Sequence, residues 1–126
     1  AFLGVNGAGK TTTFKMLTGE IAPTTGEAYI CGHNLNTEMD QARELIGYCP
    51  QFDAISELLT TREHLRLYSD IKGIPKDRIE ALSEEMIDQM DLRQYADQQA
   101  GTYSGGNKRK LSVAMALIGN PAVAFL

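Results

Sequence analysis

The chain has 126 residues, of which 43% are hydrophobic and 22% charged, and its formal net charge is −4. This length suffices for one modest domain with a hydrophobic core. The acidic balance argues against a general binder of nucleic acid or acidic membranes, whose surface carries a basic excess. No run of about 18 uncharged apolar residues is present, so we expect no part of the sequence to insert into a membrane.

The two cysteines and the two ends of the sequence indicate the state of the thiols and the extent of the protein. Cys31 and Cys49 have no CxxC spacing, and we interpret them as reduced, partly buried thiols. The sequence begins with "AFLG" and ends with "AVAFL". Because an apolar strand at a bare terminus is an aggregation hazard, we expect a piece of a longer protein, truncated at both ends.

The first half of the sequence predicts short strands and helices around a glycine-rich loop. The expected elements, in order, are the end of a buried strand over 1–3, a helix over 10–18 stopped by Gly19, a strand over 27–32, a loop and short helix within 34–47, and a strand over 46–49 ended by Pro50.

The second half predicts mostly helix. Thr60 and Glu63 have the spacing of a capping box and predict a helix over 61–73 that Gly73 closes. A second amphipathic helix is expected over 75–92, with a face that we interpret as core packing: Ile79, Leu82, Met86 and Met90. A polar stretch, a helix from Ser104 to a stop near Asn120 and Pro121, and a final strand follow. The order predicts an α/β core with a helical insert.

The stretch "GVNGAGKT", from Gly4 to Thr11, fits the P-loop pattern G-x-x-x-x-G-K-[ST]. Its glycines permit a backbone nest of N–H groups at a helix N-terminus, where anions bind. Lys10 supplies a charge for the β- and γ-phosphates, and the Thr11 hydroxyl is placed to bind Mg²⁺. The residues predicted to bind the nucleotide are Gly4, Asn6, Gly7, Ala8, Gly9, Lys10, Thr11 and Thr12. The alternative is a strand-to-helix turn that merely needs glycines.

The stretch "YSGGNKRKLS", residues 103–112, contains residues that are unfavourable at the start of a helix. Apolar residues at helical spacing follow, so Ser104 is expected to be the N-cap. Two glycines are poor helix formers, and Lys108, Arg109 and Lys110 lie near a helix end that is already positive.

This stretch resembles the signature motif of ATP-binding cassette (ABC) ATPases, whose usual form is Leu-Ser-Gly-Gly-Gln. Gln51, in "YCPQFD", lies where that family has its Q-loop glutamine. The P-loop, Q-loop and signature stretches together look like subfamily A of the ABC transporters, and most like the second of its two cassettes. Members of this subfamily are large eukaryotic membrane proteins that mostly move lipids or sterols.

The resemblance implies a P-loop NTPase (RecA-like) core, a small antiparallel β subdomain and an inserted α-helical subdomain. The implied division is 1–51 for the P-loop core and β part, 52–118 for the helical subdomain with the signature, and 119–126 for the start of the Walker B strand. It places the parent protein's cassette at the cytoplasmic face of a membrane, beside transmembrane domains.

The resemblance also implies a partner. Two cassettes of such a protein face each other head to tail, so the signature of one covers ATP held by the P-loop of the other. Ser104, Gly105, Gly106 and Asn107 would then contact ATP on a second cassette, expected in the same long chain, whereas Lys10, Thr11 and Gln51 would act on this chain's own ATP and Mg²⁺. The signature cations are expected on the solvated side of the helix, or as an ordinary solvated face.

Several residues depart from the family pattern or lie beyond the sequence. Tyr103 and Asn107 replace the usual Leu and Gln. The Walker B Asp and Glu and the switch His would follow Leu126, so residues 1–126 alone are expected not to hydrolyse ATP at a useful rate. His33 and His64 are expected to be surface or loop histidines. The apolar residues Phe52, Ile55 and Leu58 are expected either to dock on the transmembrane domains or to pack in the core.

Three other functions fit parts of this pattern. One is a soluble ABC ATPase acting on ribosomes or DNA, and another is a non-hydrolytic ATP clamp or sensor. A P-loop small-molecule kinase fits least well, because the signature stretch has no role there.

Overall fold

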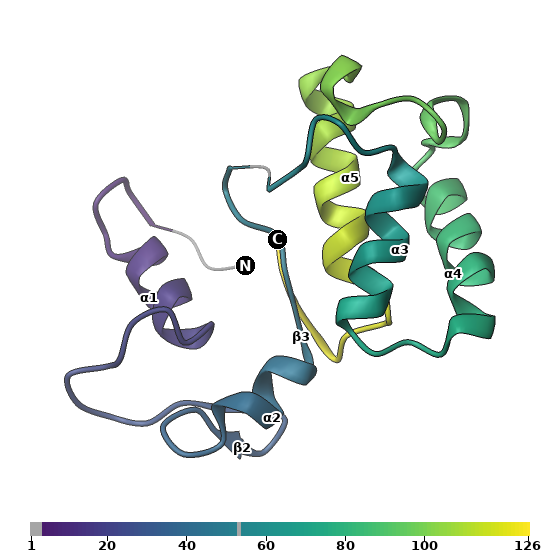
Figure 1. Ribbon diagram of the computed structural model, residues 1–126. Coiled ribbons are helices and arrows are strands. Elements are labelled where there is room, and N and C mark those ends of the chain that lie inside the picture. Colours follow the sequence, from purple (N-terminus) through teal and green to yellow (C-terminus); the bar gives the residue numbers. More distant parts are fainter. Residues whose placement is uncertain (1–3, 53) are drawn as a thin grey trace.

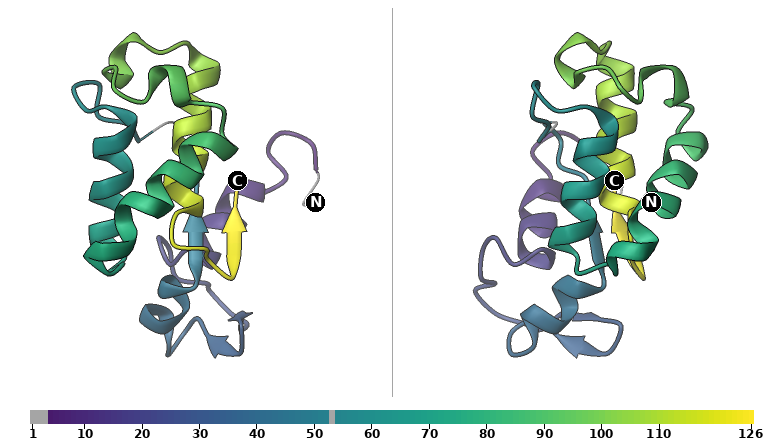
Figure 2. Two further views of the ribbon diagram at one scale, coloured as in Figure 1. Left: turned by 90° about the vertical axis from the view of Figure 1, so that its right-hand side faces the viewer. Right: turned by 45° about the vertical axis from the view of Figure 1, so that its right-hand side comes forward.

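The computed structural model describes residues 4–52 and 54–126 (Figure 1). The strand end expected over 1–3 lies outside the described residues. The elements are α1 (Lys10–Leu17), β1 (Tyr29–Ile30), β2 (His33–Asn34), α2 (Met39–Glu44), β3 (Ile46–Tyr48), α3 (Thr61–Ile71), α4 (Lys76–Gln89), the 3₁₀ turns η1 (Arg93–Tyr95) and η2 (Ala100–Thr102), α5 (Gly105–Leu117) and β4 (Val123–Phe125). The expected α/β class is confirmed, with α3, α4 and α5 forming a separate helical lobe (Figures 1 and 2).

Strands β3 and β4 form a parallel pair, although the whole helical lobe lies between them in sequence. Their register pairs Ile46 with Val123 and Tyr48 with Phe125, and the Cys49 N–H extends the ladder to the Phe125 carbonyl at 2.8 Å. Parallel strands need a long crossover connection, and here that connection is the helical lobe. The carboxyl ends of both strands therefore lie at one edge.

Strands β1 and β2 form a short antiparallel hairpin beside α2. The single strand expected over 27–32 is wrong in extent, because Cys31 and Gly32 turn the chain with φ of 49° and 88°. Two consecutive residues with positive φ match the twist of a tight hairpin. Ile30, Leu35 and Ala42 form a small buried cluster under this hairpin. Cys31 is exposed at the turn, contrary to expectation, whereas Cys49 is buried.

The capping box at the start of α3 is confirmed. The Thr60 hydroxyl accepts the Glu63 N–H at 3.2 Å, and the Glu63 carboxylate accepts the Thr60 N–H at 2.8 Å. That backbone donor favours the charged carboxylate and so lowers the pKa of Glu63. At the other end, Gly73 has a φ of 70° and ends the helical turn, as the sequence predicts.

The buried row of α4 is Ile79, Ser83 and Ile87, each four residues from the next. The expected face is therefore rotated, because residues at i and i+4 lie over one another on a helix. Met86 and Met90 flank this row and are partly buried against the core, which confirms that they serve packing.

The helical lobe has one continuous core between α3, α4, α5 and the two 3₁₀ turns. Its buried members are Leu65, Ile87, Leu92, Ala96, Ala100, Tyr103, Leu111, Ala114, Met115 and Ile118. At the C-terminal end of α5, the Lys72 ammonium donates to the carbonyls of Ala116 at 3.2 Å and Ile118 at 2.9 Å. Partial burial lowers the pKa of Lys72. A cation at the C-terminus of α5 satisfies carbonyls that the helix leaves unpaired.

The contact between β3 and the end of α5 predicts a steric effect at Gly47. A Cβ there would overlap the Ala116 carbonyl oxygen and lie 2.8 Å from Pro121 Cγ. We expect Gly47→Ala to lower the free energy of unfolding by at least about 2 kcal/mol, because overpacking forces backbone to shift. Urea unfolding measures this. Gly105→Ala is the control, because a Cβ there meets no described atom within 4 Å, and it should be neutral or stabilising by up to about 1 kcal/mol. Equal stability of both variants would contradict the packing described.

Candidate functional site

The glycine-rich loop leads directly into α1 in a conformation that requires glycine. Gly7 and Gly9 both have a φ of 85°, and Gly9 is the residue that caps α1. Side chains with a Cβ rarely adopt this left-handed region. The Ala8 N–H donates to the Val5 carbonyl at 3.2 Å and closes a turn within the loop. The backbone freedom predicted for these glycines is confirmed.

Lys10 lies half-buried across the mouth of this loop. Its ammonium donates to the carbonyls of Gly4 at 2.5 Å and Val5 at 2.8 Å. An ammonium group has three donors, so a phosphate can be bound while part of this bonding is kept. The loop and the Lys10 side chain therefore stabilise one another in the arrangement that an anion would meet.

A cavity of about 570 Å³ opens beside the loop. Its walls are the loop, the first turn of α1, the carboxyl ends of β3 and β4, and two further side chains, Gln51 and Arg109. The predicted nucleotide ligands that line it are Asn6, Gly7, Gly9, Lys10, Thr11 and Thr12. Gly4 and Ala8, which were also predicted, are not among the described lining residues. Ligands bind at the carboxyl ends of parallel strands in open α/β sheets generally.

A ring contact and the position of Gln51 after β3 shape this cavity. The rings of Phe14 on α1 and Phe125 on β4 pack edge to face, with centroids 5.6 Å apart, which seats the helix on the strand pair. Gln51 is exposed and follows β3 after a two-residue step. The structure thus brings the predicted Q-loop residue and the P-loop to one cavity, as their separate motifs required.

The donor set of the cavity suits the groups that the motifs imply. Anions bind at helix N-termini, and α1 begins on the cavity wall beside a lysine ammonium. The Thr11 hydroxyl and the Gln51 amide oxygen are oxygen donors, which Mg²⁺ prefers, and Mg²⁺ keeps several waters and phosphate oxygens. Across the described residues, no group of His, Cys, Asp and Glu is arranged to hold a metal by itself.

The signature stretch starts α5, and Ser104 caps it as predicted. The Ser104 hydroxyl accepts the Asn107 N–H at 3.3 Å. Gly105 and Gly106 are exposed and lie in the first helical turn. A Cβ at Gly105 would meet no described atom within 4 Å, and one at Gly106 would lie 3.9 Å from the Ser104 hydroxyl. Neither the backbone conformation nor packing within the described chain therefore requires glycine here.

The structure does not bring the signature stretch to the P-loop cavity of the same chain. None of residues 104–107 is among the described residues that line it. The start of α5 lies at the end of the helical lobe away from the β3–β4 pair (Figures 1 and 2). The signature stretch and the P-loop therefore do not contribute to one site within this chain.

Lys108 and Lys110 pair at the surface with exposed carboxylates, as expected of a solvated face, whereas the expected solvated position of Arg109 is wrong. Lys108 Nζ lies 3.3 Å from Glu57 Oε1, and Lys110 Nζ lies 3.3 Å from Asp91 Oδ2. Arg109 donates to the Pro50 carbonyl at 2.6 Å. These contacts offset the unfavourable placement of cations near a helix N-terminus. Sequence pattern alone had no signal for them, because each partner lies on a distant segment.

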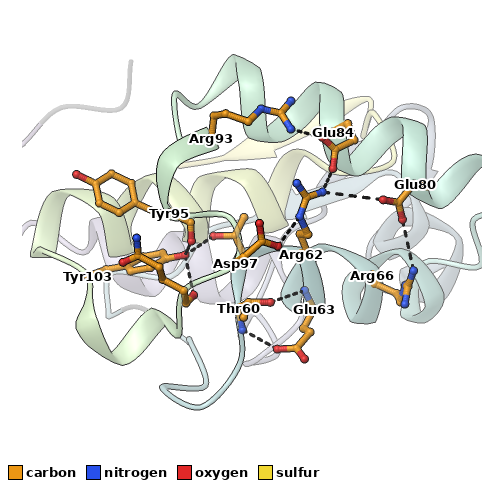
Figure 3. Close-up of polar contacts among 12 residues, drawn as sticks. Thr60, Arg62, Glu63, Arg66, Glu80, Glu84, Arg93, Tyr95, Asp97 and Tyr103 are labelled. Carbon is orange, nitrogen blue, oxygen red and sulfur yellow. Dashed lines mark hydrogen bonds and ion pairs between the residues drawn. The ribbon is translucent and has the colours of Figure 1, made fainter.

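Tyr103, which replaces the family's usual Leu, is buried and holds the turn that precedes the signature (Figure 3). Its hydroxyl donates toward the carbonyls of Tyr95 at 2.5 Å and Gln98 at 3.1 Å. It also lies 2.8 Å from the Thr61 hydroxyl. Because the phenol has one proton, which faces the carbonyls, Thr61 is the donor in that last contact.

An ion network fixes the same turn from outside. Arg62 on α3 bonds Asp97 at 2.8 Å and pairs with Glu84 on α4, and Glu84 also pairs with Arg93 (Figure 3). Exposed pairs contribute little individually, but here one arginine connects α3, α4 and the 95–98 turn.

His64 is buried, at 1% exposure, so its expected place on the surface is wrong. Its Nε2 accepts the Ser56 N–H at 3.0 Å, and its Nδ1 lies 2.8 Å from the Thr60 carbonyl. A backbone N–H can only donate, so the ring proton is on Nδ1. His64 is therefore a neutral structural residue that holds the chain just before α3. His33 lies in β2 with Nδ1 3.4 Å from Glu38.

Comparison with known proteins agrees with this geometry. The family described as ABC transporter matches residues 1–126, and the chain belongs to this family. It is 56% identical to the retinal-specific phospholipid-transporting ATPase ABCA4 of Bos taurus over 98% of this chain and 5% of that protein. It is 53% identical to the ATP-binding cassette sub-family A member 7 of Mus musculus, over 98% of this chain and 6% of that protein.

Solved structures give the same fold. The ATP-binding subunit of an ABC transporter matches with a TM-score of 0.84 and 29% identity, over 97% of this chain and 51% of that one. The cbiO1 protein from Clostridium perfringens, part of the ABC transporter complex cbiONQ, matches with a TM-score of 0.84 and 21% identity, over 97% and 50% of the two chains. The expected P-loop NTPase fold with its helical insert is thereby confirmed. Among the described residues, no helix has the length and apolar character to cross a membrane.

The Tyr103 contacts predict that removing its hydroxyl group lowers the stability of the fold. We expect Tyr103→Phe to cost about 1–3 kcal/mol, because it leaves buried carbonyls and the Thr61 hydroxyl without their partner. Tyr95→Phe is the matched control: it keeps the ring contact to Tyr103, whose centroids are 5.7 Å apart, and the backbone carbonyl. Denaturant unfolding of both variants measures the difference, and equal stabilities would show that the phenol contacts contribute nothing.

Proposed function

We propose that this chain binds ATP with Mg²⁺ and works as one of two cassettes that drive a membrane transporter, with a lipid as the transported substrate. The observation that carries the proposal is the single cavity that joins the P-loop, Gln51 and the carboxyl ends of β3 and β4. Phosphoryl transfer depends chiefly on positioning and on electrostatic stabilisation, and this cavity supplies groups for both.

The polar groups of the cavity have distinct roles in this proposal. The N–H groups of Gly7, Gly9 and the first turn of α1 bind the phosphates, and Lys10 neutralises charge on the β- and γ-phosphates. The Thr11 hydroxyl and the Gln51 amide oxygen would hold Mg²⁺, and Gln51 would also orient the attacking water. Bound Mg²⁺ supplies neutralisation of the charge that develops on the phosphate oxygens.

The exposed glycines of α5 support a site shared with a second cassette. Gly105 and Gly106 weaken a helix without any need inside the described chain. Their use is to let an outside phosphate approach the backbone N–H groups at a helix N-terminus, where the dipole favours an anion. Ser104 and Asn107 then hydrogen-bond to ATP that is held by the other cassette's P-loop.

The lipid substrate and the membrane setting rest on the relatives. One relative is named a phospholipid-transporting ATPase, at 56% identity over 98% of this chain. The chain spans 5% of that relative's length, so transmembrane partners, a second cassette and a place at the cytoplasmic face of a membrane belong to the proposal. The division at 51/52 and 118/119 and the low ATP turnover of residues 1–126 alone stay predictions.

The Q-loop carries the surface proposed to meet the transmembrane domains. Phe52 is 83% and Leu58 76% exposed, which is unusual for large apolar side chains. Ile55 is different: it is half-buried and packs against the core of the helical lobe. The docking surface is therefore proposed for Phe52 and Leu58 alone.

Lys10 gives the test of nucleotide use. In the full-length protein, Lys10→Ala is expected to lower ATP turnover by about 10²–10³-fold, the usual loss when one preorganised charge-stabilising donor is removed. Lys15→Ala is the matched control, because Lys15 lies on the same helix and pairs with Glu20 at 3.4 Å. It should keep turnover within about twofold. Unchanged turnover in Lys10→Ala would overturn the proposed function.

Phe52 and Leu58 give the test of coupling. In the full-length protein, Phe52→Ala together with Leu58→Ala should leave ATP binding intact while lipid transport per ATP hydrolysed falls severalfold, because the apolar contact to the membrane domains is lost. Leu67→Ala is the control, because Leu67 is another large apolar side chain at 45% exposure and lies within α3. Full transport coupling in the double variant would contradict the docking surface.

A further inference from the structure

Arg109 lies between the two functional parts of this chain. It belongs to α5, whose first residues carry the signature, yet it is among the residues that line the P-loop cavity, as are Lys10 and Gln51. It donates to the Pro50 carbonyl at 2.6 Å. That carbonyl belongs to the peptide bond that joins Pro50 to Gln51, so the contact acts on the backbone next to the Q-loop glutamine.

The rest of the segment from Pro50 to Leu59 (the Q-loop segment), described except for residue 53, is fastened to the turn before α5. The Gly101 N–H donates to the Glu57 carbonyl and the Ala100 N–H to the Leu59 carbonyl, each at 2.9 Å. Lys108 on α5 pairs with the Glu57 carboxylate at 3.3 Å. A Cβ at Gly101 would lie 3.0 Å from the Glu57 carbonyl oxygen, so the two backbones are in close contact. The Q-loop segment and the signature helix thus touch at both ends of that segment.

Placing Arg109 at this position costs hydration free energy, so we expect its guanidinium to serve a specific contact. The guanidinium is half-buried, so it gives up part of its hydration. A planar guanidinium forms rigid, directional hydrogen bonds, which suits it to hold one carbonyl at a fixed distance from one helix.

We propose that Arg109 is a positioning residue that couples this chain's two ATP sites: it links the backbone at Gln51, in the chain's own site, to the helix that presents Ser104–Asn107 to the partner's ATP. The inference rests on the proposed function. A shift of Gln51 toward bound nucleotide pulls on Pro50, and the bond to Arg109 passes the shift to α5. Because α5 is one continuous helix from Gly105 to Leu117, its first turn moves with Arg109.

Coupling of this kind is reciprocal. Closure of the partner's ATP against Ser104 and Gly105 fixes α5, and α5 then holds Pro50 and Gln51 in place for this chain's own nucleotide. Arg109 contacts neither ATP in this account, so it affects turnover through Gln51 and Ser104 and leaves nucleotide binding by the P-loop itself unchanged.

The experiment is a double-mutant cycle on ATP turnover in the full-length protein. Arg109→Met removes the guanidinium and keeps an unbranched apolar stem. It should lower kcat about 10-fold, with the KM for ATP within about twofold because Lys10 and its loop are untouched. Arg109→Lys, which can still donate to the carbonyl, should recover most of kcat. Lys110→Ala is the control, because Lys110 pairs with Asp91 away from the Q-loop.

The double-mutant cycle distinguishes coupling between the two sites from independent or structural effects of the substitutions. Adding Arg109→Met to Gln51→Ala, or to Ser104→Ala, should cost little beyond the first substitution, because residues that act as a unit have non-additive effects. Three results would each overturn the inference: losses that multiply in both cycles, a kcat for Arg109→Met equal to that of Lys110→Ala, or loss of folding in both Arg109→Met and Arg109→Ala, which would mark a structural residue. If Lys10→Ala keeps its turnover, the proposed function itself fails; if Lys10→Ala is inactive and the cycles are additive, only the coupling fails.

Discussion

The parallel pairing of β3 with β4 is the constraint on which the rest of this structure depends. Parallel neighbours require a crossover, so the chain must leave the top of β3 at Cys49 and return to the bottom of β4 at Val123. Everything between is that crossover, which explains why Gln51 emerges beside the P-loop and why α5 has to run back toward the strands. The Cys49 N–H bond to the Phe125 carbonyl, at 2.8 Å, aligns both strand ends at the cavity.

The structure shows how helix α5 is stable although its first residues are unfavourable for a helix. Its buried face, with Leu111, Ala114 and Met115, and the Lys72 contacts at its C-terminus provide its stability. Its first turn contributes little, and the glycines there cost about 1 kcal/mol each relative to alanine. Tyr103 partly offsets this loss of helix stability, because its buried phenol fixes the residue immediately before the Ser104 cap. The departure from the family's usual Leu thus adds polar contacts at a position where Leu could only pack.

The sequence was sufficient wherever the cause of a feature was local. Gly7 and Gly9, the Thr60–Glu63 capping box and the Ser104 cap depend on residues within one turn of each other, and each is found as predicted. His64 and Arg109 were misjudged because their hydrogen-bond partners come from other segments. A histidine within a polar run gives no sign that its ring accepts the Ser56 N–H, and a basic helix turn looks solvated until the segment that covers it is known.

The two misjudged residues, together with Lys108, have something in common: all three side chains hold the Q-loop segment. His64 bonds Ser56, Lys108 pairs with Glu57 and Arg109 bonds Pro50. That segment also carries the exposed Phe52 and Leu58. A short stretch of irregular backbone with two large exposed apolar side chains would be mobile if it were unsupported. Its contacts with α3, with α5 and with the turn before α5 instead hold it against the helix that carries the signature.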